Sequence, residues 1–280
     1  MEADYHQEFI GIDEGGKQLL RGNTSSPTLR WRVDISGFPR TRSLQIIPGG
    51  LGLAGFEGGF FEFDLLNGEI IRSFINRRGV SWAHRAAGGR TLLGGINLAG
   101  GRGICLEQLD ASLNHAGLTC MRGGYVRLFT MLGGENGSKP DGFLLAANRR
   151  ILETDSDMQE IREYRARGFR HAWMARKLDD GDVLVSAGYG AFMARFAPDG
   201  ALVTRFGDKK QMPANTRPFF YASFDIASDA SVYVANWQGH GQSHGHKGRQ
   251  LLHFAADGAY LQGWSWPAEI SSLQGLILLS

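Results

Sequence analysis

Three of the eight histidines of this 280-residue chain lie within one short stretch, residues 236–250. A neutral imidazole is the commonest metal ligand in proteins and also transfers protons near neutral pH. The spacing of His240, His244 and His246 matches no specific metal motif, so three interpretations stay open. The histidines bind a metal, they contact a substrate or act on it as acid and base, or they belong to a solvated polar loop.

The residues around these histidines favour a working surface over a buried core. The stretch contains four glycines and no aliphatic side chain, and it opens with Asn236, Trp237 and Gln238. Strand-like runs at residues 231–235 and 251–254 border it, so we expect a long loop between two strands. Glycine gives the backbone freedom that suits a lid over a ligand. We expect Trp237 to offer a flat face to a ring of that ligand.

Two further histidines lie in segments that resemble each other, Trp82-Ala-His-Arg and His171-Ala-Trp-Met. A histidine on a strand is commonly a core residue with a satisfied hydrogen bond. If these strands line a channel, however, His84 and His171 become candidates for acid and base, together with His240.

The elements that position these side chains come from a degenerate repeat. Alternating strands close on an aspartate at an expected turn, mostly 44 to 46 residues apart, except for a first spacing of 30 and a last of 58. Asp side chains accept hydrogen bonds from nearby backbone N–H groups, so we expect these carboxylates to shape turns and not to perform catalysis. The aspartates are Asp34, Asp64, Asp110, Asp155, Asp199 and Asp257.

Each copy of the repeat reads as a four-stranded antiparallel meander. A second apolar strand lies about ten to fifteen residues before each copy of the aspartate-closed strand, and a further strand usually follows the aspartate. This period and strand count are typical of β-propeller blades. We therefore expect residues 1–280 to form a single all-β domain, a six-bladed β-propeller closed by pairing of its terminal strands. Seven blades or a β-sandwich are the alternatives. The runs 270–279 and 8–12 compete for the innermost position of the closing blade.

A propeller places certain connections together on one face, around the mouth of its central channel. These are the links from second to third strands, and from the last strand of one blade to the first of the next. Loops on a rigid scaffold are where binding residues concentrate. The expected mouth residues are Asn23, Glu57, Asn97, Asn148, Tyr189, the stretch 236–250, and the strand starts near His84, Arg127, His171 and Tyr221.

In period and strand pattern, nearly the whole chain resembles the superfamily of six-bladed propellers. That superfamily includes the gluconolactonase and paraoxonase type, strictosidine-synthase-like proteins and various lyases, and no family signature motif is matched. In the gluconolactonase type, a divalent metal sits in the channel on carboxylate and Asn oxygens. The resemblance implies a comparable place for Glu57, Asn97, Asn148 and Asn236, although Gly188 interrupts the series.

The leading hypothesis is a small-molecule-active propeller: a hydrolase, lyase or isomerase of a polar or cyclic substrate, with a divalent metal as candidate cofactor. The alternative is a non-catalytic platform that binds proteins or glycans. It requires mouth polar groups that bond to one another, and no deep cavity. The candidate residues are His84, His171 and His240 for catalysis, Asn97, Asn148, Tyr189, Asn236, Trp237 and Gln238 for substrate, and His244, His246 and Glu57 for a metal.

The composition narrows the partners and the compartment. The formal net charge is +2 with dispersed basic residues, so a nucleic-acid partner is not indicated. The N-terminus lacks the regions of a signal peptide, and no apolar run approaches the ~20 residues of a membrane span. We therefore expect a cytoplasmic protein without a membrane partner, or a secreted one if a leader precedes Met1. The oligomeric state stays open.

The two cysteines, Cys105 and Cys120, flank an expected hairpin. A bridge between neighbouring strands is one possibility, and free half-buried thiols are the favoured interpretation.

Overall fold

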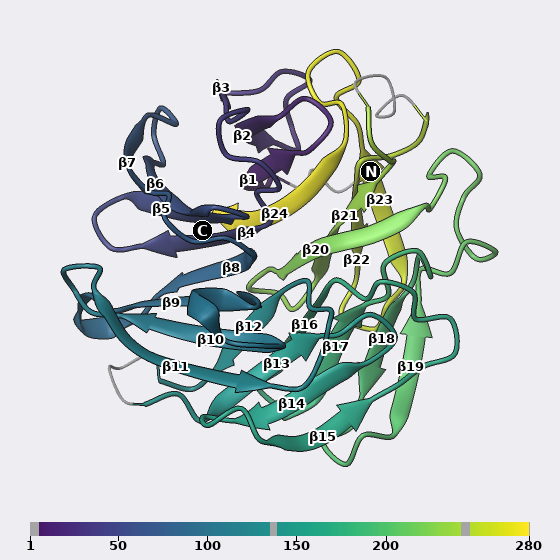
Figure 1. The fold of residues 1–280 in the computed structure, drawn as a ribbon. Coiled ribbons are helices and arrows are strands. Elements are labelled where there is room, and N and C mark those ends of the chain that lie inside the picture. The colour runs from purple at the N-terminus through teal and green to yellow at the C-terminus, as the bar shows by residue number, and fades with distance from the viewer. Residues whose placement is uncertain (1–5, 135–138, 242–246, 280) are drawn as a thin grey trace.

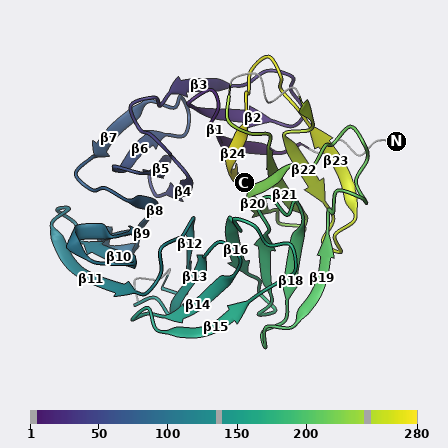
Figure 2. The same cartoon turned by 45° about the vertical axis from the view of Figure 1, so that its right-hand side comes forward.

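The computed structural model describes residues 6–134, 139–241 and 247–279 of the chain. In these residues the structure is all-β, with two short 3-10 turns, η1 (Ala87–Gly89) and η2 (Leu98–Gly100), as its helical elements. Six antiparallel sheets of four strands follow one another around a central axis (Figures 1 and 2). This arrangement is a six-bladed β-propeller, as the repeat predicts. No helix in the described residues is long and apolar enough to cross a membrane.

The first blade joins the two ends of the chain. From the axis outward it runs β24 (Leu273–Leu279), β1 (Glu8–Asp13), β2 (Gln18–Asn23) and β3 (Trp31–Asp34). β24 pairs antiparallel with β1, so the last strand of the chain closes the ring beside the first (Figure 1). The predicted closure by the two terminal strands is confirmed, and the C-terminal run holds the innermost position.

The other five blades each use one continuous segment of chain. Their strands, from the axis outward, are β4 (Ser43–Ile47), β5 (Leu51–Phe56), β6 (Gly59–Asp64) and β7 (Ile70–Phe74); β8 (Val80–Arg85), β9 (Thr91–Ile96), β10 (Ile104–Leu109) and β11 (His115–Met121); β12 (Phe129–Leu132), β13 (Gly142–Ala146), β14 (Ile151–Asp155) and β15 (Glu160–Tyr164); β16 (Met174–Lys177), β17 (Val183–Ser186), β18 (Met193–Phe196) and β19 (Leu202–Phe206); β20 (Phe220–Ile226), β21 (Val232–Trp237), β22 (Leu251–Phe254) and β23 (Tyr260–Trp264).

Burial explains why the middle strands are apolar runs and the outer ones are not. Every residue of β13 and β17 is buried, because neighbouring blades cover both faces of a middle strand. The outermost strands face water on one side. In β7, for example, Ile71 is 51% exposed.

The first blade corrects the predicted strand register. The C-terminal strand β24 is the innermost strand of this blade, so each N-terminal strand lies one position further out than predicted. Residues 18–23 form the third strand, and the fourth strand, β3, lies within the run 29–34. Asn23 pairs with Glu8, at the opposite end of the sheet from the β1–β2 hairpin. The prediction that Asn23 lies at the channel mouth is therefore wrong. The short first spacing of the repeat has the same cause.

The aspartates at the strand ends shape turns. Oδ1 of Asp64, Asp110 and Asp155 accepts the backbone N–H of the residue two positions further on, at 2.7 to 2.9 Å. Asp199 and Asp257 do the same at 2.9 Å. The expected turn chemistry is confirmed.

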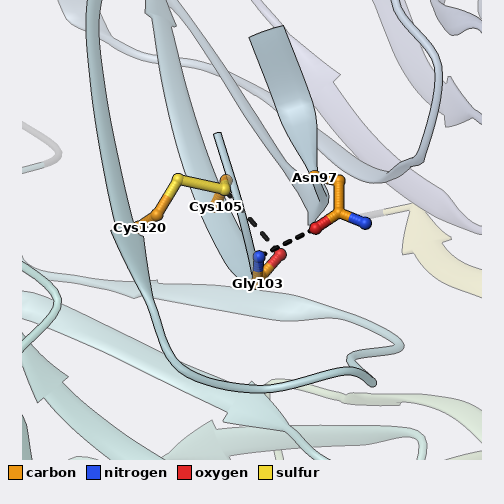
Figure 3. Close-up of a disulfide and its surroundings, with 4 residues drawn as sticks. All are labelled: Asn97, Gly103, Cys105 and Cys120. Carbon is orange, nitrogen blue, oxygen red and sulfur yellow. Dashed lines mark hydrogen bonds between the residues drawn. A yellow bond between two sulfur atoms is a disulfide. The ribbon is translucent and has the colours of Figure 1, made fainter. Parts of the chain in front are cut away.

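The two cysteines are bonded to each other, so the favoured interpretation of free thiols is wrong. Cys105 of β10 lies directly opposite Cys120 of β11, with 4.1 Å between their Cα atoms. Such a short separation of paired positions lets the two sulfur atoms meet. Figure 3 shows this disulfide and, close to it, the side chain of Asn97.

Candidate functional site

The connections that follow β1, β5, β9, β13, β17 and β21 emerge on one face of the ring, which we call the mouth. A cavity of about 150 Å³ opens there, and five of the six blades contribute to it. Its lining consists of Glu14, Arg40, Arg42, Arg127, Trp173, Tyr189, Phe220, Trp237, His240 and Gln274.

Aromatic rings form one side of this cavity. Tyr189 meets Phe220 edge to face at 4.7 Å and 84°, and Phe220 meets Trp237 at 5.3 Å and 74°. Trp173 packs on Phe220 in the same manner at 5.5 Å. Edge-to-face contacts of this kind fix ring orientations. Trp237 is only 3% exposed, so it forms a fixed wall of the cavity and not an open stacking platform.

Glu14 organises the rim beside that wall. Its Oε1 accepts a hydrogen bond from Nδ1 of His240 at 2.8 Å, and its Oε2 accepts the indole N–H of Trp237 at 3.2 Å. The backbone N–H of Glu14 donates to the carbonyl of Ser272, just before β24. Because a carboxylate only accepts, Nδ1 of His240 carries the proton, and Nε2 has no hydrogen-bond partner among the described residues.

Three arginines also line the cavity. Arg40 and Arg42 lie just before β4, and Arg127 lies just before β12. Arg40 is paired with Glu57 at 2.6 Å. Burial, then the neighbouring charges of Arg127 and Arg40, lower the pKa of Arg42 to about 10. Its guanidinium therefore stays charged at neutral pH in surroundings that disfavour the charge.

A hydrogen-bonded chain leads from these arginines to His171. The Arg127 Nε–H donates to the hydroxyl oxygen of Tyr125 at 2.5 Å, and that hydroxyl lies 2.6 Å from Nδ1 of His171. Burial, then the charges of Arg127 and Arg170, lower the pKa of His171, so it is neutral at neutral pH and accepts the Tyr125 O–H. Burial raises the pKa of Tyr125, which keeps its proton.

Two neighbouring blades hold His171 in place. Oδ1 of Asn148 accepts the backbone N–H of His171 at 3.1 Å. On the other side, Gly188 forms bridges to Arg170 and Tyr221 with a φ of +62°. A Cβ on Gly188 would lie 2.1 Å from the carbonyl oxygen of His171, so only glycine fits there. Asn148 thus positions a candidate residue without lining the cavity.

The other predicted amide residues bind the protein itself. Asn236 is fully buried; its Nδ2 donates to the carbonyl of Arg249 and its Oδ1 accepts the N–H of Phe219. Gln238 donates to the carbonyl of Arg217. Asn97 accepts the N–H of Gly103 at 2.8 Å (Figure 3). These amides stabilise mouth loops, and none of them lines the cavity.

His84 lies away from the mouth. It is the fifth of six residues in β8, which starts at the mouth with Val80, so its ring lies towards the other end of the channel. There it stacks on Trp82 and lines a separate cavity of about 650 Å³. Burial lowers the pKa of His84 to about 4. The prediction that His84 shares one site with His171 and His240 is therefore wrong.

The predicted metal ligands are not gathered in the described part of the chain. Glu57 is occupied by Arg40. Across residues 6–134, 139–241 and 247–279, no group of three His, Cys, Asp or Glu side chains stands close enough to hold a metal ion. His244 and His246 lie outside the described residues, so the proposed metal site stays a prediction.

Sequence reasoning did not single out Glu14, Arg40, Arg42 or Tyr125. Glu14 lies between β1 and β2. This connection reaches the mouth because β1 is the second strand of the first blade, which the sequence did not establish. Arg42 immediately precedes an innermost strand, a position that the repeat already associates with the mouth.

Comparison with known proteins agrees with this architecture. No protein-family profile matches the sequence, and no curated protein matches it. Among solved structures, a protein of unknown function from Bacteroides caccae is 16% identical with a TM-score of 0.78, over 98% of this chain and 99% of that one. The fold is shared; the activity is not thereby assigned.

Two further structures are lyases. A catalytically inactive virginiamycin B lyase from Staphylococcus aureus, solved with quinupristin, is 10% identical with a TM-score of 0.61, over 100% of this chain and 93% of that one. A streptogramin B lyase is 11% identical with a TM-score of 0.57, over 93% and 80% of the two chains. At these identities the likeness supports the propeller fold alone.

Proposed function

We propose that the protein acts on a small organic molecule at the channel mouth by acid–base chemistry, as a hydrolase, lyase or isomerase. The observation that carries this proposal is the pair formed by His240 and Glu14 at the rim of the aromatic cavity. His171, with its Tyr125 partner, is the second candidate for proton transfer.

The chemistry follows from the way Glu14 holds the imidazole. A carboxylate that accepts the Nδ1–H fixes the tautomer, leaves Nε2 basic, and stabilises the imidazolium that forms when Nε2 takes a proton. Trp237 donates to the second oxygen of the same carboxylate, which fixes its orientation. A base held in this way removes a proton from a bound substrate and returns it to a leaving group or to another carbon.

The structural neighbours are consistent with this class of reaction. Two of them are lyases named for streptogramin B and virginiamycin B, on the same propeller fold. The cavity itself argues against the alternative of a purely flat interaction platform, although the mouth amides bond to the protein as that alternative requires. We propose as well that a divalent metal is held with the help of His244 and His246, and that a glycan is a candidate ligand.

The test is a turnover screen followed by two mouth variants. Purified protein is incubated with a panel of ring-containing esters, lactones and elimination substrates, quinupristin included, and products are detected by mass spectrometry. For any substrate turned over, we expect His240→Gln and Glu14→Gln to lower kcat by roughly 10²- to 10⁴-fold, with a smaller change in KM.

The chain offers a matched control for these variants. His115 on β11 forms the same kind of pair with Glu107, at 3.0 Å, and neither residue lines the mouth cavity. We expect His115→Gln to keep full activity. Equal activity in His240→Gln and His115→Gln, or no turnover across the panel, would favour the binding platform instead.

A further inference from the structure

Arg42 is a partly buried cation with no counter-ion among the described residues. Its side chain has no hydrogen bond or ion pair with any residue in the described part of the chain, whereas its backbone N–H is bonded to the carbonyl of Gly55. The charges of Arg127 and Arg40 repel it, and the opposing attraction of Glu57, which is paired with Arg40, is smaller than either repulsion. A charge removed from water is costly unless it is paired, so this arrangement calls for an anion.

The carboxylates around the mouth do not meet that need. Glu57 is bonded to Arg40. Glu14, the acidic residue in the cavity lining, is bonded to His240 and Trp237. Both acidic groups therefore have their own partners, and the cavity surface beside Arg42 keeps a net positive charge.

Arg127 is oriented to share an anion with Arg42. Its guanidinium carbon lies 4.9 Å from the ring centre of Tyr125 and 5.6 Å from that of Trp173, and its Nε–H is bonded to the Tyr125 hydroxyl. These contacts fix the plane of the guanidinium. They leave its terminal N–H groups available, and planar guanidinium groups recognise carboxylates through paired hydrogen bonds.

We propose that the mouth cavity binds an organic carboxylate that carries a flat ring. Arg42 and Arg127 hold the carboxylate, and the ring lies against Trp173, Phe220 and Trp237. This inference deepens the proposed function, on which it rests for the claim that this ligand is also the substrate. Binding alone does not depend on turnover.

The dimensions agree with a single ring. A cavity of about 150 Å³ accommodates a molecule the size of benzene. The aromatic rings supply an apolar surface for the ligand ring, and the arginines line the same cavity, with Arg127 next to Trp173. Inorganic anions would use the arginines and leave the aromatic wall without a contact.

Isothermal titration calorimetry with three probes tests the proposal: benzoate, the neutral isostere benzamide, and inorganic phosphate. We expect benzoate to bind at least roughly tenfold more tightly than either of the others. Loss of a charge-assisted hydrogen bond makes Arg42→Met bind benzoate roughly tenfold to a hundredfold more weakly, with an intermediate loss in Arg42→Lys. Arg32→Gln, which removes an arginine paired with Glu269 away from the cavity, should bind as the unchanged protein does.

Three results would overturn the proposal: benzamide equal to benzoate, phosphate equal to benzoate, or undiminished benzoate affinity in Arg42→Met. Circular dichroism melts of each variant ensure that a loss of binding is not a loss of folding, and Arg127→Met provides a second variant with the same expected loss.

The two proposals fail separately. If the protein binds benzoate but His240→Gln does not change turnover, the proposed reaction is wrong and the proposed ligand class stands. If the protein turns over neutral substrates but does not bind benzoate, the proposed ligand class is wrong and the proposed reaction stands.

Discussion

The two ends of the central channel differ in how their charges are balanced. The end opposite the mouth has the larger cavity, about 650 Å³, and both of its cationic lining residues, Arg176 and Lys177, are paired with carboxylates. Lys177 lies 3.0 Å from Glu153, and Arg176 is bonded to Asp225. The mouth has a cavity of only about 150 Å³, yet Arg42 finds no counter-ion in the described part of the chain.

This difference teaches that cavity size alone does not locate function in a propeller. The charges at the larger end have structural tasks: Glu153 also accepts the hydroxyl of Tyr164, and Asp225 accepts the backbone N–H of Leu278 in the closing strand β24. A cation that the fold leaves unpaired is the stronger sign of a missing ligand, because an unpaired buried charge lowers stability.

The largest effect on stability is expected at the end of the channel opposite the mouth, where the charged groups are paired. Asp225→Ala leaves Arg176 without its partner and removes the acceptor of Leu278 N–H and Ile226 N–H. We expect the free energy of unfolding to fall by about 2–4 kcal/mol, measured by urea denaturation. Asp157→Ala, which removes an exposed carboxylate paired with exposed Lys139, should change it by less than about 0.5 kcal/mol. Equal effects would erase the structural role assigned to this end.

A smaller effect is expected where the mouth depends on a left-handed glycine. Gly188→Ala places a Cβ against the His171 carbonyl at a φ of +62°. We expect a loss of about 1–3 kcal/mol in thermal unfolding. If His171 contributes to the mouth, kcat falls as well. Gly37→Ala, at a position with open space around it and no positive φ, is the matched control. An unchanged melting temperature in Gly188→Ala would contradict the packing described for His171.

Acid should weaken the protein through His84. Burial lowers its folded-state pKa to about 4 from the usual 6.5, so between these values the unfolded chain binds a proton that the folded protein does not. Stability is therefore complete above about pH 6.5 and falls as the pH drops towards 4. Between pH 6.5 and pH 4, we expect the free energy of unfolding to fall by about 1–2 kcal/mol less in His84→Gln than in the unchanged protein. The difference is limited to this size because the ring keeps some contact with water.

His253, whose pKa burial also lowers to about 4, accounts for acid sensitivity that persists in the His84→Gln variant. A pH profile of unfolding identical in His84→Gln and the unchanged protein would contradict the burial of this ring.

The smallest effect is expected for Arg42→Met. Because no described residue pairs with this guanidinium, its removal should change the free energy of unfolding by less than about 0.5 kcal/mol or raise it. The same change at the opposite end of the channel, Arg176→Met, should lower the free energy of unfolding by about 1–2 kcal/mol because Asp225 loses its partner. A loss above about 1 kcal/mol in Arg42→Met would mean that the folded chain already satisfies this charge.

Much of the fold could be predicted from the sequence because it follows local rules. The repeat period, the apolar middle strands and the turn aspartates each depend on residues near in sequence. The sequence left open which terminal run is innermost in the first blade, because the choice depends on the pairing of β1 with β24, about 270 residues away along the chain. Because β1 is the second strand and not the first, Asn23 lies away from the mouth and Glu14 lies at it.

The site was harder to predict because partners decide what a polar residue does. Asn236, at the mouth end of β21, and Gln238, just after that strand, lie at the mouth as expected, but their side-chain N–H groups donate to the backbone carbonyls of Arg249 and Arg217. Conversely, Arg42 stands out only because no carboxylate in the described part of the chain is bonded to it, and no sequence motif shows such a missing partner. The disulfide likewise depended on Cys105 and Cys120 being paired directly opposite each other.

A crystal soaked with 4-iodobenzoate tests the central claim most directly, since anomalous scattering locates the iodine without ambiguity. The account requires an iodine peak in the mouth cavity, with the carboxylate within hydrogen-bonding distance of Arg42 and Arg127. A peak in the larger cavity beside His84 instead, or a mouth without ligand at saturating concentration, would contradict it.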